Sequence, residues 1–150
     1  MEIVHRDAQQ ITGISIRTTN LAEMNPATAK IGALYQRFDQ QVPVDYKTGA
    51  RVFGVYFNYA SDHQGEFSVL AGVDKIDPQH EKNLETITLP AATYMVFEAK
   101  GEIPQIVIET WQKIWSHFSD PSVEHKRAYT TDFEHYKSQN EAAIYISLKS

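Results

Sequence analysis

The chain contains no cysteine, which excludes disulfide bridges and thiolate chemistry. Its six histidines are scattered, and none forms an H-x-x-x-H or H-E-x-x-H pair, so we expect no metal site. The G-x-S-x-G, Walker and G-x-G-x-x-G patterns are also missing. We therefore expect no cofactor and no catalytic residue set of a familiar type.

Long apolar runs and basic clusters are lacking as well. No stretch approaches the roughly 18 apolar residues of a membrane span, and the start, MEIVHRDAQQ, has no signal-peptide core, so we expect a soluble cytoplasmic protein without a membrane partner. The net charge is −5 and no basic cluster exceeds Lys126-Arg127, which favours a cation over nucleic acid as partner. Because strand patterning begins almost at Met1, we expect no DNA-binding domain in the chain.

Aromatic residues, by contrast, are abundant: eight Tyr, seven Phe and two Trp make up 11% of the chain. A chain of 150 residues is long enough for one domain with a real core and a pocket. Aromatic side chains supply apolar area to such a core, and they also offer π faces to ligands.

Residue periodicity predicts seven strands and two helices. The expected strands cover residues 2–17, 52–59, 66–73, 84–89, 91–99, 127–137 and 142–149. Asn25-Pro26 is expected to open the first helix, with Asn25 as N-cap, and the apolar stripe of this helix ends at Phe38. The second helix is expected over residues 104–118, because Ser119-Asp120-Pro121 stops it.

A weak internal repeat relates two halves, residues 1–80 and 81–150 approximately. Adding 80 carries the apolar helix positions 27, 31, 34, 35 and 38 onto 107, 111, 114, 115 and 118, and carries strand 11–17 onto strand 91–97. The hairpins follow with a shift of about 76. Each half reads strand–helix–strand–strand, so we predict one α+β domain with pseudo-twofold symmetry, antiparallel strands, two long helices on one face and a central cleft.

The strand over residues 127–137 carries the most informative side chain, Glu134. Strand alternation places Asp132, Glu134 and Tyr136 on one face, and Phe133 and His135 on the other. If the first face is the inner one, Glu134 is a buried acid that must be hydrogen-bonded, protonated or paired with a cation. The alternative is that Glu134 faces solvent on an edge strand, as most glutamates do.

These residues resemble a known family. The run Asp132-Phe133-Glu134-His135-Tyr136, followed by residues 143–148 (AIYISL), is similar to the C-terminal signature of the GyrI-like domain, an F-E-x-Y strand before an E-I-Y-I-P-I-like strand. That domain is the effector-binding module of some AraC- and MerR-type regulators. Residues 53–56 and the helix over 104–118 agree more loosely. The chain resembles a free-standing member of the kind carried on mobile integron cassettes.

The resemblance implies a Rob C-terminal-like duplicated fold with a hydrophobic cleft that binds cationic, often aromatic, small molecules. It assigns the counter-charge to Glu134, at the glutamate of F-E-x-Y, and a pocket-lining position to Tyr145. Two positions depart from the pattern. Ala143 stands where the family often has a second Glu, which suggests one acid in the site, and Ser147 replaces the usual Pro.

Other aromatic residues are candidates for the walls of such a cleft. Each of them is individually more typical of a core, but some must line any space between two halves. The candidates are Trp111, Trp115, Tyr94, Tyr56, Phe57 and Tyr35.

The sequence leaves three functional classes open. The first is a module that binds amphipathic cations, acting alone or signalling to a separate regulatory protein, as a monomer or homodimer. The second is a hydrolase of reactive small molecules in which Glu134 acts as general base beside a tyrosine. The third is a protein-binding inhibitor, of gyrase for example, as the family name suggests.

Overall fold

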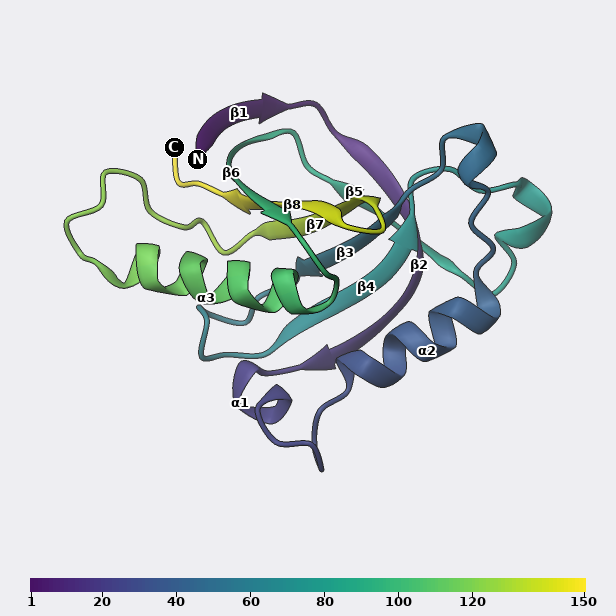
Figure 1. The fold of residues 1–150 in the computed structure, drawn as a ribbon, viewed down its shortest axis with the longest axis horizontal. Helices are drawn as coiled ribbons and strands as arrows, with labels where there is room; N and C mark the ends of the chain where they lie inside the picture. The colour runs from purple at the N-terminus through teal and green to yellow at the C-terminus, as the bar shows by residue number, and fades with distance from the viewer.

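The computed structural model describes all 150 residues, and its centre is one curled antiparallel sheet of eight strands with three α-helices (Figure 1). The helices are α1 (Asn20–Glu23), α2 (Ile31–Gln41) and α3 (Gln105–Ser119). The strands are β1 (Glu2–Arg6), β2 (Gln9–Thr18), β3 (Val52–Phe57), β4 (Phe67–Val73), β5 (Glu85–Leu89), β6 (Ala92–Lys100), β7 (Thr131–Ser138) and β8 (Glu141–Ser147). No helix is long and apolar enough to cross a membrane.

The order of strands across the sheet confirms the predicted duplication. It runs β1-β6-β8-β7-β3-β4-β2-β5, so the inner six strands form two equivalent triplets, β6-β8-β7 and β3-β4-β2. The two triplets meet where β3 pairs with β7, and in that ladder Gly54 lies opposite Glu134. The pseudo-twofold relationship therefore places the F-E-x-Y strand at the junction of the halves.

The outer strands exchange between halves, which the sequence patterning did not predict. We expected a single strand over residues 2–17, but Asp7 and Ala8 interrupt it. β1 then pairs with β6 of the second half, and β5 pairs with β2 of the first half. The prediction was wrong there because periodicity describes one strand's faces and carries no information about its partner.

The long helices lie on one face of the sheet, each over its own half. α2 buries Leu34 and Phe38 among residues of β4, and α3 buries Val107 and Ile114 against β6 and β8. Both apolar stripes follow helical spacing, which is why the sequence located them. The two helices lie apart from each other on this face (Figure 1).

The helix that we expected to open at Asn25-Pro26 is α2, and it begins later than predicted, at Ile31. Asn25 caps only a turn, since its side chain accepts a hydrogen bond from the amide of Ala27. The carboxylate of Glu23 caps α2 instead, and accepts from the amides of Lys30 (2.9 Å) and Ile31 (3.1 Å). The capping group comes from α1 across a loop, so the local Asn-Pro signal misplaced the helix start.

The opposite face of the sheet carries a second aromatic cluster. The rings of Phe133 and Tyr145 stack with centroids 4.5 Å apart, and Tyr94 packs edge-on against both. The guanidinium of Arg6 lies 4.9 Å from the centroid of Tyr145. Tyr145 thus faces a cation, but that cation belongs to the chain itself.

Candidate ligand-binding site

A cavity of about 1250 Å³ opens on the helix-bearing face, between α2 and α3 and above the junction of β3 and β7. Of its 26 lining residues 14 are hydrophobic, so the cavity suits a ligand that is mostly apolar with few polar groups. The residues used below are Tyr35 from α2, Trp111 and Trp115 from α3, Tyr56 from β3, and Glu134 and Tyr136 from β7.

Glu134 lies at the floor of this cavity and is 2% exposed. Strand alternation turns its side chain to the same face as Tyr136, as predicted, and this face is the inner one. The position opposite on β3 is Gly54, which has no side chain to occupy the space that the carboxylate fills. The arrangement excludes the alternative in which Glu134 faces solvent.

Three neutral donors hold the Glu134 carboxylate. The indole Nε1 of Trp111 and the hydroxyl of Tyr56 donate to Oε2 at 2.7 Å and 2.8 Å, and the hydroxyl of Tyr136 donates to Oε1 at 2.7 Å. Burial raises the pKa of Glu134 above its ordinary value, although the three hydrogen bonds lower it in part. The donors orient the acid without neutralising it.

A fourth aromatic group stands beside the same carboxylate. The hydroxyl of Tyr35 is buried without a hydrogen-bond partner, and it borders the space above Gly54 that also holds Oε1 of Glu134. Burial and the nearby charge of Glu134 raise the pKa of Tyr35. This hydroxyl is therefore a neutral group with free hydrogen-bonding capacity at the cavity floor.

No cation of the protein pairs with Glu134. The four ion pairs of the structure join other groups, and the buried one is between Arg127 and Asp132. A buried carboxylate ordinarily has a charged partner, because transferring it from water costs several kcal/mol. Glu134 has hydrogen bonds in place of one, so its carboxyl group has no charged partner within the protein.

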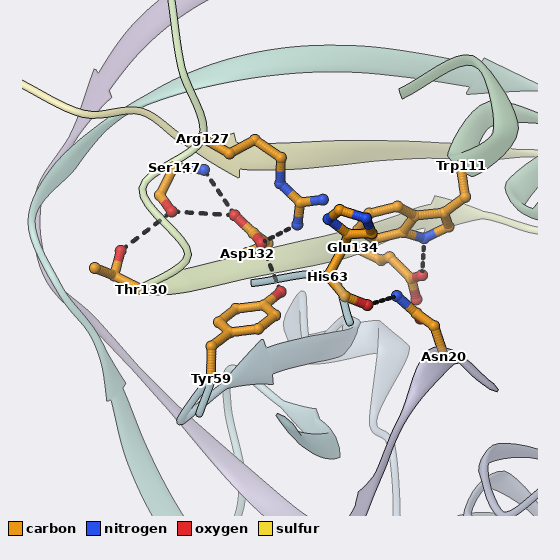
Figure 2. Close-up of polar contacts among 9 residues, drawn as sticks. All are labelled: Asn20, Tyr59, His63, Trp111, Arg127, Thr130, Asp132, Glu134 and Ser147. Atoms are coloured by element: carbon orange, nitrogen blue, oxygen red, sulfur yellow. Dashed lines mark hydrogen bonds and ion pairs between the residues drawn. The ribbon is translucent and has the colours of Figure 1, made fainter. Parts of the chain in front are cut away.

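A second polar cluster lies next to the first, around Asp132 (Figure 2). Its Oδ2 accepts from Nη2 of Arg127 at 2.8 Å and from the hydroxyl of Tyr59 at 2.6 Å, and its Oδ1 accepts from the amide of Ser147 at 2.8 Å. Figure 2 shows Trp111 with its indole nitrogen bonded to Glu134, while Arg127 and Tyr59 are bonded to Asp132. Arg127 and Tyr59 also line the cavity.

Of the eight residues that the sequence proposed for the site, the structure places five on the cavity and three elsewhere. Glu134, Trp111, Trp115, Tyr56 and Tyr35 line it. Tyr145, Tyr94 and Phe57 pack into the cluster on the other face of the sheet.

Strand alternation explains why those three side chains point away. Phe57 follows Tyr56 directly, so the two cannot share a face. Ile144, rather than Tyr145, lies opposite Glu134 in the β7–β8 ladder. Ala143 lies on the same far face as Tyr145, so a second acid at that position would not enter this cavity.

Several polar residues of the cavity were not among the proposed ones, including Tyr136, Tyr59 and Arg127. Tyr136 could have been found, because it lies two residues from Glu134 on one strand face. Arg127 had no such signal. It precedes β7, and its backbone pairs with the sheet only through an isolated bridge to Leu148.

The chain is similar to a known protein family, to a bacterial protein and to solved structures. The Cass2 family, described as "Integron-associated effector binding protein", matches residues 2–148. The Bacillus subtilis (strain 168) protein named "Putative transcriptional regulator protein YobU" is 32% identical over 160 residues, which cover 98% of this chain and 96% of that protein. The crystal structure of integron cassette protein VCH_CASS2, from the mobile metagenome of Vibrio cholerae, has a TM-score of 0.91 at 41% identity, covering 99% of this chain and 95% of that one.

A more distant structure shares the fold. SAV2435, solved with bound tetraphenylphosphonium, has a TM-score of 0.72 at 19% identity, and the match covers 99% of this chain and 93% of that chain. At this identity the likeness concerns the architecture alone.

Proposed function

The chain belongs to the Cass2 family of integron-associated effector binding proteins, and from that premise we propose that it binds small amphipathic cations with aromatic groups, using Glu134 as the counter-charge. The observation that carries the proposal is a carboxylate 2% exposed, held by three neutral donors, with no cation of the protein beside it. The tetraphenylphosphonium bound to SAV2435 supports the same class of ligand.

The energetics favour a cation because folding has already removed the acid from water. A ligand that brings a positive charge gains the attraction of Glu134 in a medium of low dielectric constant, and the desolvation of the acid is not repeated. The rings of Tyr56 and Trp111, whose centroids are 5.1 Å apart, lie beside the same carboxylate. A ring face that contacts the cation contributes about 0.5–2 kcal/mol to the binding free energy. Burial of the ligand's own rings against the apolar walls supplies the rest.

The test is a matched pair of ligands on a matched pair of proteins. Methyltriphenylphosphonium and its uncharged isostere 1,1,1-triphenylethane have the same shape and differ in charge. Both tryptophans line the cavity, so their fluorescence follows binding without a label. We expect Glu134→Gln to weaken the phosphonium by about tenfold to a hundredfold, because removing the charge forfeits about 1–3 kcal/mol, and to leave the hydrocarbon within about twofold.

Three results would contradict the proposal. Equal loss of both ligands in Glu134→Gln would mean that the substitution disturbs the cavity and that charge is not what it recognises. A reactive ester or strained-ring substrate consumed over many turnovers by the wild type, but not by Glu134→Gln, would make the protein a hydrolase. Capture of a specific protein without any ligand binding would favour an inhibitor of that protein.

A further inference from the structure

Arg127 is a buried hydrogen-bond donor at the cavity, and most of its capacity is unused. A guanidinium has five N–H donors, and the structure gives this one a single hydrogen bond, from Nη2 to Asp132. Nε is buried without a partner, and Nη1 has no protein acceptor. The side chain as a whole is 5% exposed, and Nη1 is the unused nitrogen that is not fully buried.

The guanidinium is held so that the unused donors have a fixed direction. Its Cζ lies 4.4 Å from the ring centroid of Tyr129 and 6.0 Å from that of Trp111. Asp132 holds one edge of the guanidinium through the 2.8 Å ion pair to Nη2. Tyr129 itself adopts φ 54°, a left-handed conformation that bulky residues rarely adopt. Such strain is typical of residues that position a functional group.

The Arg127 and Glu134 side chains belong to one cavity. Arg127 and Glu134 both line it, and Trp111 links them by bonding to Glu134 while its ring lies beside the guanidinium. Asp132, which holds Arg127, lies two residues from Glu134 on the same face of β7, a separation of about 7 Å along the strand. A ligand of drug size spans that distance.

The charges at this site specify what kind of acceptor fits. Among the buried charged groups, Arg127 and Asp132 neutralise each other, and Glu134 contributes one negative charge. A monocation with a neutral oxygen acceptor leaves the filled cavity without net charge. A zwitterion would add a carboxylate and leave one uncompensated charge away from water, which is costly.

We propose that Arg127 forms a second polar subsite, which donates a hydrogen bond to a neutral carbonyl-type oxygen of the cationic ligand. A short alkyl chain separates this oxygen from the positive charge of the ligand. This inference rests on the proposed function, because it assumes that the cation occupies the cavity at Glu134. It narrows the ligand class from amphipathic cations in general to cations that also carry a ketone, ester or amide.

Two triphenylphosphonium salts provide the test, one with a 5-oxohexyl chain and one with a 5-methylhexyl chain. They have the same charge and nearly the same shape, and only the ketone can accept a hydrogen bond. Arg127→Lys keeps a positive charge for Asp132 and removes the free guanidinium donors. We expect this variant to bind the ketone about tenfold more weakly and the hydrocarbon salt within about twofold of wild type.

Controls separate this effect from a general loss of structure. Arg37→Lys makes the same substitution on the exposed surface of α2, outside the cavity lining, and should change neither affinity. A ketone labelled with ¹³C at the carbonyl should show a downfield shift when bound to the wild type, because a hydrogen bond from a guanidinium polarises the carbonyl. This second measurement needs no variant.

Each outcome decides between the proposals. Equal effects of Arg127→Lys on the two salts, or an unshifted carbonyl resonance, would overturn the subsite while binding that depends on Glu134 still stands. The proposal would also be overturned if the (4-carboxybutyl)triphenylphosphonium zwitterion bound more tightly than the ketone. That result would mean that the subsite binds an anion rather than a neutral acceptor. If the wild type binds none of these salts, the cation-binding function fails and the subsite fails with it.

Discussion

Gly54 lies directly opposite Glu134 in the ladder between β3 and β7, and a Cβ at Gly54 would stand 2.6 Å from Oε1 of the carboxylate. The same Cβ would also meet the hydroxyl of Tyr35. The absence of a side chain on one strand is therefore what makes room for the acid on its neighbour. A glycine that is ordinarily a weakness in a strand here has a specific use.

Gly54→Ala should consequently damage the site. The added methyl group must displace Glu134 from its hydrogen bonds, and we expect the affinity for methyltriphenylphosphonium to fall by about tenfold and the free energy of unfolding by about 1–3 kcal/mol. Calorimetric titration and urea denaturation measure the two quantities. Gly32→Ala in α2 is the stability control: its Cβ would meet nothing within 4 Å, so that variant should be more stable by about 0.5–1 kcal/mol. An unchanged affinity in Gly54→Ala would show that the acid has more room than its neighbours suggest.

The ionisation of Glu134 should contribute to the pH dependence of the free energy of unfolding. Burial raises its pKa in the folded protein above the ordinary value of 4.5, so between these two pKa values the folded state holds more protons than the unfolded state. The free energy of unfolding then decreases as pH rises through that window, and this contribution increases again on acidification. Glu134→Gln should lack it. Thermal melting of the two proteins across acidic to neutral pH tests the difference, and parallel profiles would contradict the assignment.

Cation binding should depend on pH in the opposite direction. A cation binds the ionised carboxylate, so affinity should rise with pH up to the raised pKa of Glu134 and then level off. Within that window, binding should release a proton. Calorimetry in buffers of different ionisation enthalpy measures the release, and a binding heat independent of the buffer at every acidic pH would count against it.

Trp111→Phe should weaken the site through its electrostatics. The variant keeps an aromatic ring near Tyr56 but loses the indole N–H, whose 2.7 Å hydrogen bond lowers the pKa of Glu134. We expect the pH at which phosphonium binding is half lost to move upward, and binding at that pH to weaken about fivefold to tenfold. Trp115→Phe removes no hydrogen bond to the carboxylate, so its binding curve should keep the wild-type midpoint. Equal shifts in the two variants would rule out the role of the indole N–H.

The start of α2 predicts a contrast between two capping candidates. The side chain of Glu23 accepts hydrogen bonds from the amides of Lys30 and Ile31, whereas the side chain of Asn25 accepts only from the amide of Ala27. Glu23→Ala should therefore lower the free energy of unfolding by about 1–2 kcal/mol, and Asn25→Ala by clearly less. Urea denaturation of both variants gives the comparison. A larger loss in Asn25→Ala would return the helix start to the Asn-Pro signal.

Local patterns predicted the parts of the fold that depend on neighbours in sequence. The hairpin of β7 and β8, the stripe of α3 and the alternation that puts Asp132, Glu134 and Tyr136 on one face all follow from side-chain periods of 2 and 3.6 residues. The duplication followed from the recurrence of those patterns. Failures came where the deciding contact is distant: the cap of α2 from Glu23, and the exchange of β1 and β5 between halves.

The sequence by itself determined that Glu134 lies on an aromatic strand, on the same face as Asp132, in a duplicated α+β chain that lacks cysteine and a basic cluster. Only the tertiary structure decided which face of that strand is inside, which aromatic residues reach the acid, and that no arginine or lysine neutralises it. The physical reason is distance along the chain. Tyr56 and Trp111 are separated from Glu134 by 78 and 23 residues, and the burial of a charge depends on which remote segments cover it.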